Sequence, residues 1–274
     1  MKQTFSVNKA FESGFALLSN NIGVFAAVFG IVFGFRIVFW GIDSSLGFVG
    51  LNPSFAISVL PIRLIVEIVF PVASLLLAAG LLKVILQVHD GKNLDVDAAI
   101  KELFINYKYI GIQVLAVILV CFIFVGLWLM FFAVLGLTLL APYLNLNAQS
   151  LFGVSNFISG LGDNHWVFAE LIGISLIFLA AAIYLLTRIS FYMFLIVDKN
   201  LGPVESIKKS FEITSGNFWK LIGLYLVSLG VIILGLLCCC IGVLAAIPIC
   251  MVAYAHVYRK LSAEIPPLPA GQNP

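Results

Sequence analysis

Three charged residues lie inside apolar stretches and are the first candidates for chemistry. Glu67 lies about two turns into a long apolar run, and Arg63 precedes it at the spacing of an ion pair on one helix face. Arg36 lies in the preceding run at a comparable distance from the same outer surface, where it could reach Glu67 from an adjacent helix. Intramembrane charges can serve proton or ion coupling. The alternative, which we favour, is a structural ion pair with outward-snorkelling arginines.

A second group of charged residues follows the fourth apolar run. Basic side chains there could attract anionic lipid headgroups, at about 1 kcal/mol per residue, or form a docking surface. The bias of cytoplasmic connections towards basic residues is the simpler explanation. The candidates are Lys199, Lys208, Lys209 and Lys220.

Three consecutive cysteines at 238–240 do not form a convincing metal site. Consecutive helical side chains point about 100° apart, so the three thiols cannot readily ligate one metal. We interpret them as small hydrophobic residues at a tight turn, with lipid modification as the alternative.

The motifs of common enzymes are missing from the sequence. It contains no Walker, dinucleotide-binding or zincin motif, and its histidines, His89, His165 and His256, are too widely separated to assign to a catalytic triad. No basic run with interleaved aromatic residues points to nucleic acid. We therefore expect no enzymatic activity, no cofactor, no metal and no nucleic-acid partner. The expected partners are membrane lipids, with other membrane proteins or a second copy of the chain as further candidates.

The composition requires that much of this chain faces lipid. Of its 274 residues, 62% are hydrophobic and 10% are charged, and the mean hydropathy is +1.14. An ordinary soluble domain is about half apolar and about one quarter charged. Because so few charged residues cannot cover a soluble fold of this length, the sequence predicts an integral membrane protein.

Long apolar runs indicate that helices cross the membrane. A helical span needs about 20 apolar residues. Gly235 and Gly242 bracket a tight turn expected within the last run, which is long enough for two spans. The predicted fold class is therefore all-α, a polytopic membrane protein with six transmembrane helices. The runs are 22–42, 61–88, 109–140, 166–197 and 218–256.

The distribution of basic residues predicts the orientation. Connections one and three, at about 43–60 and 141–165, contain no Lys or Arg, whereas connections two and four and both ends of the chain do. Because cytoplasmic connections are enriched in basic residues, we expect both termini to be cytoplasmic.

Three short amphipathic segments precede spans one, three and five, and they align with one another. Each has a small residue (Ala10, Ala99 or Ser206), then a large apolar residue, then a phenylalanine four positions later. Pro203 and Gly216 are placed to start and end the third segment. We expect three cytoplasmic interfacial helices, each followed by a hairpin, around a pseudo-threefold axis. The predicted single membrane domain is 1–262, with repeat units 5–90, 94–198 and 201–260 and a short Pro-rich cytoplasmic tail at 263–274.

Small residues recur every four positions in the first span. Ala26, Gly30 and Gly34 form a stripe that would let two helix backbones approach closely. The stripe fits packing within the bundle and packing between protomers equally well.

The segment 188–260 carries motifs that resemble those of uncharacterised bacterial inner-membrane proteins. These include the YciC-like group and the membrane domain that accompanies some glycerophosphodiester phosphodiesterases. The resemblance implies a six-span bacterial plasma-membrane protein without the hydrolytic domain and with no catalytic residue to carry over. The motifs are Val197-Asp198, Leu201-Gly202-Pro203, Gly216-Asn217-Phe218-Trp219-Lys220 and Tyr258-Arg259.

These observations favour a structural, assembly or accessory subunit of the bacterial plasma membrane. The alternative is a transporter or lipid-handling membrane protein that uses Glu67 and Arg36.

Overall fold

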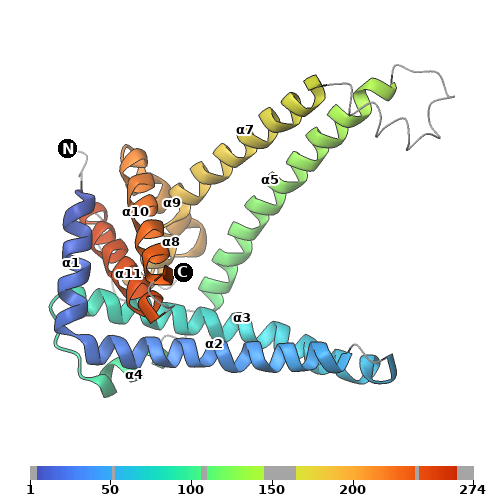
Figure 1. Cartoon of the computed structure of the whole chain (residues 1–274). Helices are drawn as coiled ribbons and strands as arrows, with labels where there is room; N and C mark the ends of the chain where they lie inside the picture. Colours follow the sequence, from blue (N-terminus) through green and yellow to red (C-terminus); the bar gives the residue numbers. More distant parts are fainter. Residues whose placement is uncertain (1–4, 51–52, 106–109, 145–164, 238–240, 264–274) are drawn as a thin grey trace. The chain divides into compact units, whose positions relative to one another are not determined.

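Helices form all the regular structure in the part of the chain that the structure, a computed structural model, describes (Figure 1). The described residues are 5–50, 53–105, 110–144, 165–237 and 241–263. The cysteines at 238–240, most of the third connection and the tail beyond 263 lie outside them. The helices are α1 (Val7–Asn20), α2 (Ile22–Gly50), α3 (Pro53–His89), α4 (Val96–Ile105), α5 (Ile110–Leu144), α7 (His165–Ile189), α8 (Tyr192–Lys199), α9 (Pro203–Thr214), α10 (Phe218–Leu237) and α11 (Ile241–Leu261).

Six helical segments of the described residues are long and apolar enough to cross a membrane. This finding confirms the prediction of six helical spans and indicates a multi-pass membrane protein. The first span begins at Ile22 as expected, but its helix continues past Asp43 to Gly50. The segments are Ile22–Gly50, Ile57–His89, Gly111–Gly136, Ile172–Lys199, Phe218–Leu237 and Gly242–Leu261.

The short helices have local start and stop signals. Asp95 accepts a hydrogen bond at 2.8 Å from the Val96 N–H, an orphan donor at the start of α4. Pro203 is the first residue of α9, and Gly216 follows that helix with a φ of 86°, a backbone conformation that favours glycine. The predicted start and end of the third amphipathic segment are thus confirmed.

The aligned positions of the three short helices have similar surroundings. Ala10 in α1, Ala99 in α4 and Ser206 in α9 are all fully buried. Asn21 and Asn217, which follow α1 and α9, each accept a main-chain hydrogen bond from the residue four positions later, at 3.1 and 2.9 Å. These shared features favour a common local design for the helix pairs α1–α2 and α9–α10.

The chain divides into two compact units, and Met1–Ala116 together with Arg188–Pro274 forms the first. Within it α1 packs along α11, α2 lies beside α3, and α10 lies beside α11 (Figure 1). The core lies where the first half of α2 and the second halves of α3 and α11 meet α8 and the short helices. Its large buried side chains include Phe25, Ile85, Leu103, Phe191, Leu195 and Tyr258.

Glycines allow close backbone approach at three helix contacts in this unit, and a Cβ atom on Gly235 of α10 would lie 2.8 Å from the Gly242 backbone of α11. A Cβ atom on Gly14 of α1 would lie 2.8 Å from the Ile249 carbonyl oxygen of α11. A Cβ atom on Gly80 of α3 would lie under 3.0 Å from the Leu103 backbone of α4. A side chain at any of these positions would therefore separate the helices.

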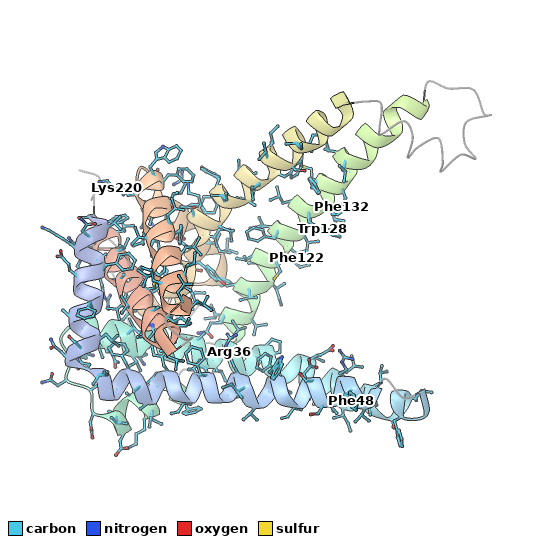
Figure 2. All side chains as sticks on the ribbon, viewed as in Figure 1. Arg36, Phe48, Phe122, Trp128, Phe132 and Lys220 are labelled. Atoms are coloured by element: carbon cyan, nitrogen blue, oxygen red, sulfur yellow. The ribbon has the colours of Figure 1, made fainter. Side chains whose placement is uncertain are left out.

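The second unit, Val117–Thr187, contains most of α5 and α7. The Phe131 and Phe178 rings contact each other edge to face with centroids 5.1 Å apart, which joins the two helices. Phe122, Trp128 and Phe132 on α5 remain 70%, 60% and 47% exposed (Figure 2). Such a surface suits contact with lipid.

Candidate functional site

Charged side chains from three spans meet at one end of the first unit. Arg259, near the end of α11, donates from one terminal nitrogen to Asp198 Oδ1 at 2.7 Å and from the other to Asp90 Oδ2 at 2.5 Å. The Tyr258 hydroxyl donates to Asp198 Oδ2 at 2.8 Å. Asp90 directly follows α3, and Asp198 lies in α8. A single guanidinium therefore joins the ends of α3, α8 and α11.

The two arms of this cluster differ in burial. The Asp198 side chain is 13% exposed, the Arg259 side chain 24% and the Asp90 side chain 40%. Lys199 Nζ lies 3.6 Å from Asp198 Oδ2. Because water screens the Asp198 arm least, that arm contributes most of the attraction. Asp198, Tyr258 and Arg259 also belong to the motifs that carry the family resemblance, so those motifs converge in space.

A histidine pair lies next to the cluster. His89 Nε2 and His256 Nδ1 are 3.1 Å apart, and His89 Nδ1 lies 3.7 Å from Asp90 Oδ1. A hydrogen bond between two imidazoles requires one nitrogen to donate and the other to accept, so at least one of these rings is neutral. In the described part of the chain, no group of three or more His, Cys, Asp and Glu side chains is placed to hold a metal. Sequence reasoning missed the pair because its members are 167 residues apart.

A further ion pair joins α3 to α4. Lys83 Nζ lies 2.9 Å from Glu102 Oε2, and Gln87 Nε2 donates to Glu102 Oε1 at 3.3 Å. Partial burial raises the pKa of the Glu102 carboxyl, but the hydrogen bonds from Lys83 and Gln87 and the charge of Lys83 outweigh burial, so the net effect is a lowered pKa. This carboxylate is stabilised in its charged form.

Ser210 of α9 bridges the break between α7 and α8. Its hydroxyl donates to the Arg188 carbonyl at 2.7 Å and accepts from the Phe191 N–H at 3.2 Å. Arg188 in turn donates to the Phe211 carbonyl at 3.1 Å. The two bonds of Ser210 satisfy backbone groups at the break, and the Arg188 bond satisfies a carbonyl in the last turn of α9.

The predicted intramembrane charges lie on α2 and α3. Arg63 Nε lies 3.1 Å from Glu67 Oε1, which confirms the expected ion pair within one helix, and 3.9 Å from Asp43 Oδ1. Arg36 forms no ion pair with Glu67 and no hydrogen bond to any described residue. Arg36, Asp43 and Glu67 instead line one pocket of about 480 Å³, together with Trp40.

The predicted lysine surface is only partly available. Lys208 and Lys220 are exposed. Lys209 pairs with Glu212 at 2.8 Å, and the Lys199 side chain is only 15% exposed beside Asp198. Lys208 and Lys220 are therefore the better candidates for a contact with a lipid headgroup or with another protein.

The small-residue stripe of the first span does not pack closely within the described chain. A Cβ atom on Gly30 or Gly34 would meet no described atom within 4 Å, and Ala26 is exposed. Packing of this stripe between protomers stays a prediction.

Comparison with known proteins gives a family without an established function. An uncharacterised protein of Mycobacterium bovis, Mb2590, and one of Mycobacterium tuberculosis strain H37Rv, Rv2560, are each 33% identical to the chain over 66 residues. Those residues are 24% of this chain and 20% of each relative, so the chain covers about one fifth of their length. No solved structure shows a significant match. The family match covers residues 20–264, and the chain therefore belongs to the family described as Protein of unknown function (DUF975).

Proposed function

We propose that this chain is a non-catalytic structural, assembly or accessory subunit of the bacterial plasma membrane. The observation that carries the proposal is the Arg259 cluster, in which one side chain contacts Asp90 and Asp198 and so joins three spans. Separating these helix ends would leave partly buried charges without their counter-ions, so the cluster fixes how the three ends pack. The short helices next to the cluster therefore pack against helix ends whose positions are fixed.

The exposed face of α9 is the docking face that we propose for a partner membrane protein. Val204, Glu205, Lys208 and Glu212 are exposed along this face, with Val204 at 64%, whereas Ser206, Ser210 and Thr214 on the opposite face are buried. A face with one large apolar side chain and charges of both signs resembles the polar rim and anchor of a protein interface.

The orientation and the repeat complete this proposal. We infer that α1, α4 and α9 are cytoplasmic interfacial helices of three repeat units, each followed by a hairpin, with both termini in the cytoplasm. The buried small residues at aligned positions support the repeat. Within the family, the motifs favour a relationship to the YciC-like group and to the phosphodiesterase-associated membrane domain. Alkaline phosphatase fused within the third connection should be active, and a fusion at either terminus should be inactive; the opposite result would reverse the orientation.

Crosslinking in native membranes tests the docking face. A photoreactive amino acid at Val204 should give a protein adduct, and extraction into nanodiscs should recover the chain with a partner. Phe48, which is 77% exposed near the far end of α2, provides the control position (Figure 2). A lone monomer without a Val204 adduct would argue against an accessory subunit.

The second candidate is a transporter or lipid-handling membrane protein that uses Glu67 and Arg36. It is favoured by the pocket that these two side chains line with Asp43 and Trp40. If Glu67→Gln changes neither transbilayer lipid distribution nor growth under membrane stress, this candidate loses its support and Glu67 is structural.

A further inference from the structure

Two pockets in the first unit adjoin at Arg36. The first, of about 480 Å³, is lined by Arg36, Asp43 and Glu67 with the aromatic side chains Phe39, Trp40 and Phe70. The second, of about 310 Å³, is lined by Arg36, Ser74 and apolar side chains that include Phe29, Phe33, Leu77 and Met251. A pocket with charged side chains and an apolar pocket that share one arginine match an amphiphile with a charged head and a hydrocarbon tail.

The charges of the polar pocket match a headgroup that carries both signs. Arg36 has no hydrogen-bond or ion-pair partner among the described residues, so its guanidinium is available to an anion. Arg63 contacts Glu67 at 3.1 Å but approaches Asp43 only to 3.9 Å, which leaves the Asp43 carboxylate with capacity to accept from a cation. Guanidinium groups bind phosphate through charge-assisted hydrogen bonds, and carboxylates accept from ammonium in the same way.

The position along α2 matches the headgroup region of a bilayer. At about 1.5 Å per residue, Arg36 lies about 21 Å from Ile22 along the helix, and Asp43 about 32 Å. If α2 crosses a hydrocarbon layer of about 30 Å along its normal from Ile22, in the orientation proposed above, Arg36 lies within the outer leaflet and Asp43 lies at its surface. Trp40, which is 72% exposed between them, is a residue type enriched at that interface.

Ser74 supplies a polar group inside the apolar pocket. Its hydroxyl oxygen is buried and has no hydrogen-bond partner among the described residues. A buried hydroxyl without a partner costs free energy, and an acceptor such as an ester carbonyl would remove that cost. The ester linkages of a glycerolipid lie between its phosphate and its chains, and Ser74 lines the same pocket as Arg36 and the apolar side chains.

We propose that the two pockets bind one aminophospholipid, a lipid whose headgroup contains a phosphate and a primary ammonium. The phosphate contacts Arg36, the ammonium contacts Asp43, and one acyl chain lies along Phe33, Leu77 and Met251. The inference rests on the second proposed function, lipid handling, and names its ligand.

Lipid retention on the purified full chain tests the site. The protein in mild detergent is equilibrated with equimolar phosphatidylethanolamine and phosphatidylglycerol. Native mass spectrometry then removes the detergent and counts the lipids that stay bound. The wild type should retain phosphatidylethanolamine about tenfold over phosphatidylglycerol, which is about 1.4 kcal/mol. Arg36→Gln should abolish the preference. Lys101→Gln, the control at an exposed residue that lines neither pocket, should keep it within about threefold of wild type, about 0.6 kcal/mol.

A second variant keeps the test decisive if Arg36→Gln misfolds. Ala78 lines the apolar pocket and is partly buried, so Ala78→Phe fills the space proposed for the chain. It should lower retention of both lipids. Equal retention by the wild type, preference for phosphatidylglycerol, or full retention by Ala78→Phe would each overturn the aminophospholipid site.

A separate measurement tests lipid handling. In proteoliposomes, a membrane-impermeant amine reagent reports the fraction of phosphatidylethanolamine in the outer leaflet. If wild type and Arg36→Gln give the same fraction while only the wild type retains the lipid, the binding site stands and the handling function fails. If neither retention nor distribution depends on Arg36, both fail.

Discussion

Replacing Arg259 by methionine tests whether the first unit is joined through one guanidinium. Removing one partner of a buried ion pair costs about 3–5 kcal/mol, and an exposed pair contributes about 0–1 kcal/mol. Asp198 is 13% exposed, but after the substitution it still accepts a hydrogen bond from the Tyr258 hydroxyl and lies near the Lys199 ammonium. Asp90 is 40% exposed, so water solvates its carboxylate. We therefore expect Arg259→Met to lower the free energy of unfolding by about 2–3 kcal/mol, and Asp90→Asn by about 1 kcal/mol or less.

The assay is unfolding by dodecyl sulfate in mixed micelles, followed by tryptophan fluorescence. Arg63→Met is the matched control, because Arg63 is 47% exposed and its pair within one helix contributes about 0.5 kcal/mol or less. The double variant Arg259→Met with Asp198→Asn should cost at least about 1 kcal/mol less than the sum of the single changes. Additive losses, or equal losses in the Arg259 and Arg63 variants, would refute the reasoning.

Two further predictions concern the contact between α3 and α4. Gly80→Ala should lower the free energy of unfolding by about 1–3 kcal/mol, because the new methyl group meets the Leu103 backbone. Gly30→Ala, the control, should change it by about 0.5 kcal/mol or less. The same unfolding titration measures both variants, and equal effects would contradict the close approach of Gly80 to α4. Glu102 has a lowered pKa in the folded protein, so its contribution is fully present above its ordinary value of 4.5 and is lost as the pH falls through the folded pKa. The difference in free energy of unfolding between wild type and Glu102→Gln should therefore shrink as the pH falls from 7 to 3. If that difference does not depend on pH, the Glu102 side chain stabilises the fold through packing and not through its charge.

The sequence was sufficient to predict the helices because their signals are local. The apolar runs required spans, and Pro203 and Gly216 carry backbone preferences that start and end α9 in isolation. The ion pair of Arg63 with Glu67 was predictable for the same reason, since four residues make one helical turn. Helix ends outside the apolar runs were less predictable, as the extension of α2 past Asp43 shows.

The contacts between helices were not predictable from one sequence. Arg259 contacts Asp90, 169 residues away, and no periodic pattern reports such a distance. The small-residue stripe suggested close packing at Gly30, but the close contacts occur at Gly14, at Gly80 and between Gly235 and Gly242, because the partner backbone decides which glycine is used. Tertiary packing of this kind depends on residues that are far apart in the sequence.

The dependence of the core on α11 has a consequence for biosynthesis. This helix supplies Arg259 and Tyr258, and its Ile249 carbonyl lies against Gly14 of α1. Until the ribosome has delivered α11, the nascent chain carries Asp90 and Asp198 without their shared counter-ion. Arg259 does not yet join the ends of α3 and α8, and membrane chaperones or proteases would meet the chain in that state. We therefore expect synthesis of the sixth span to be the step at which this protein passes from a set of inserted helices to a folded product.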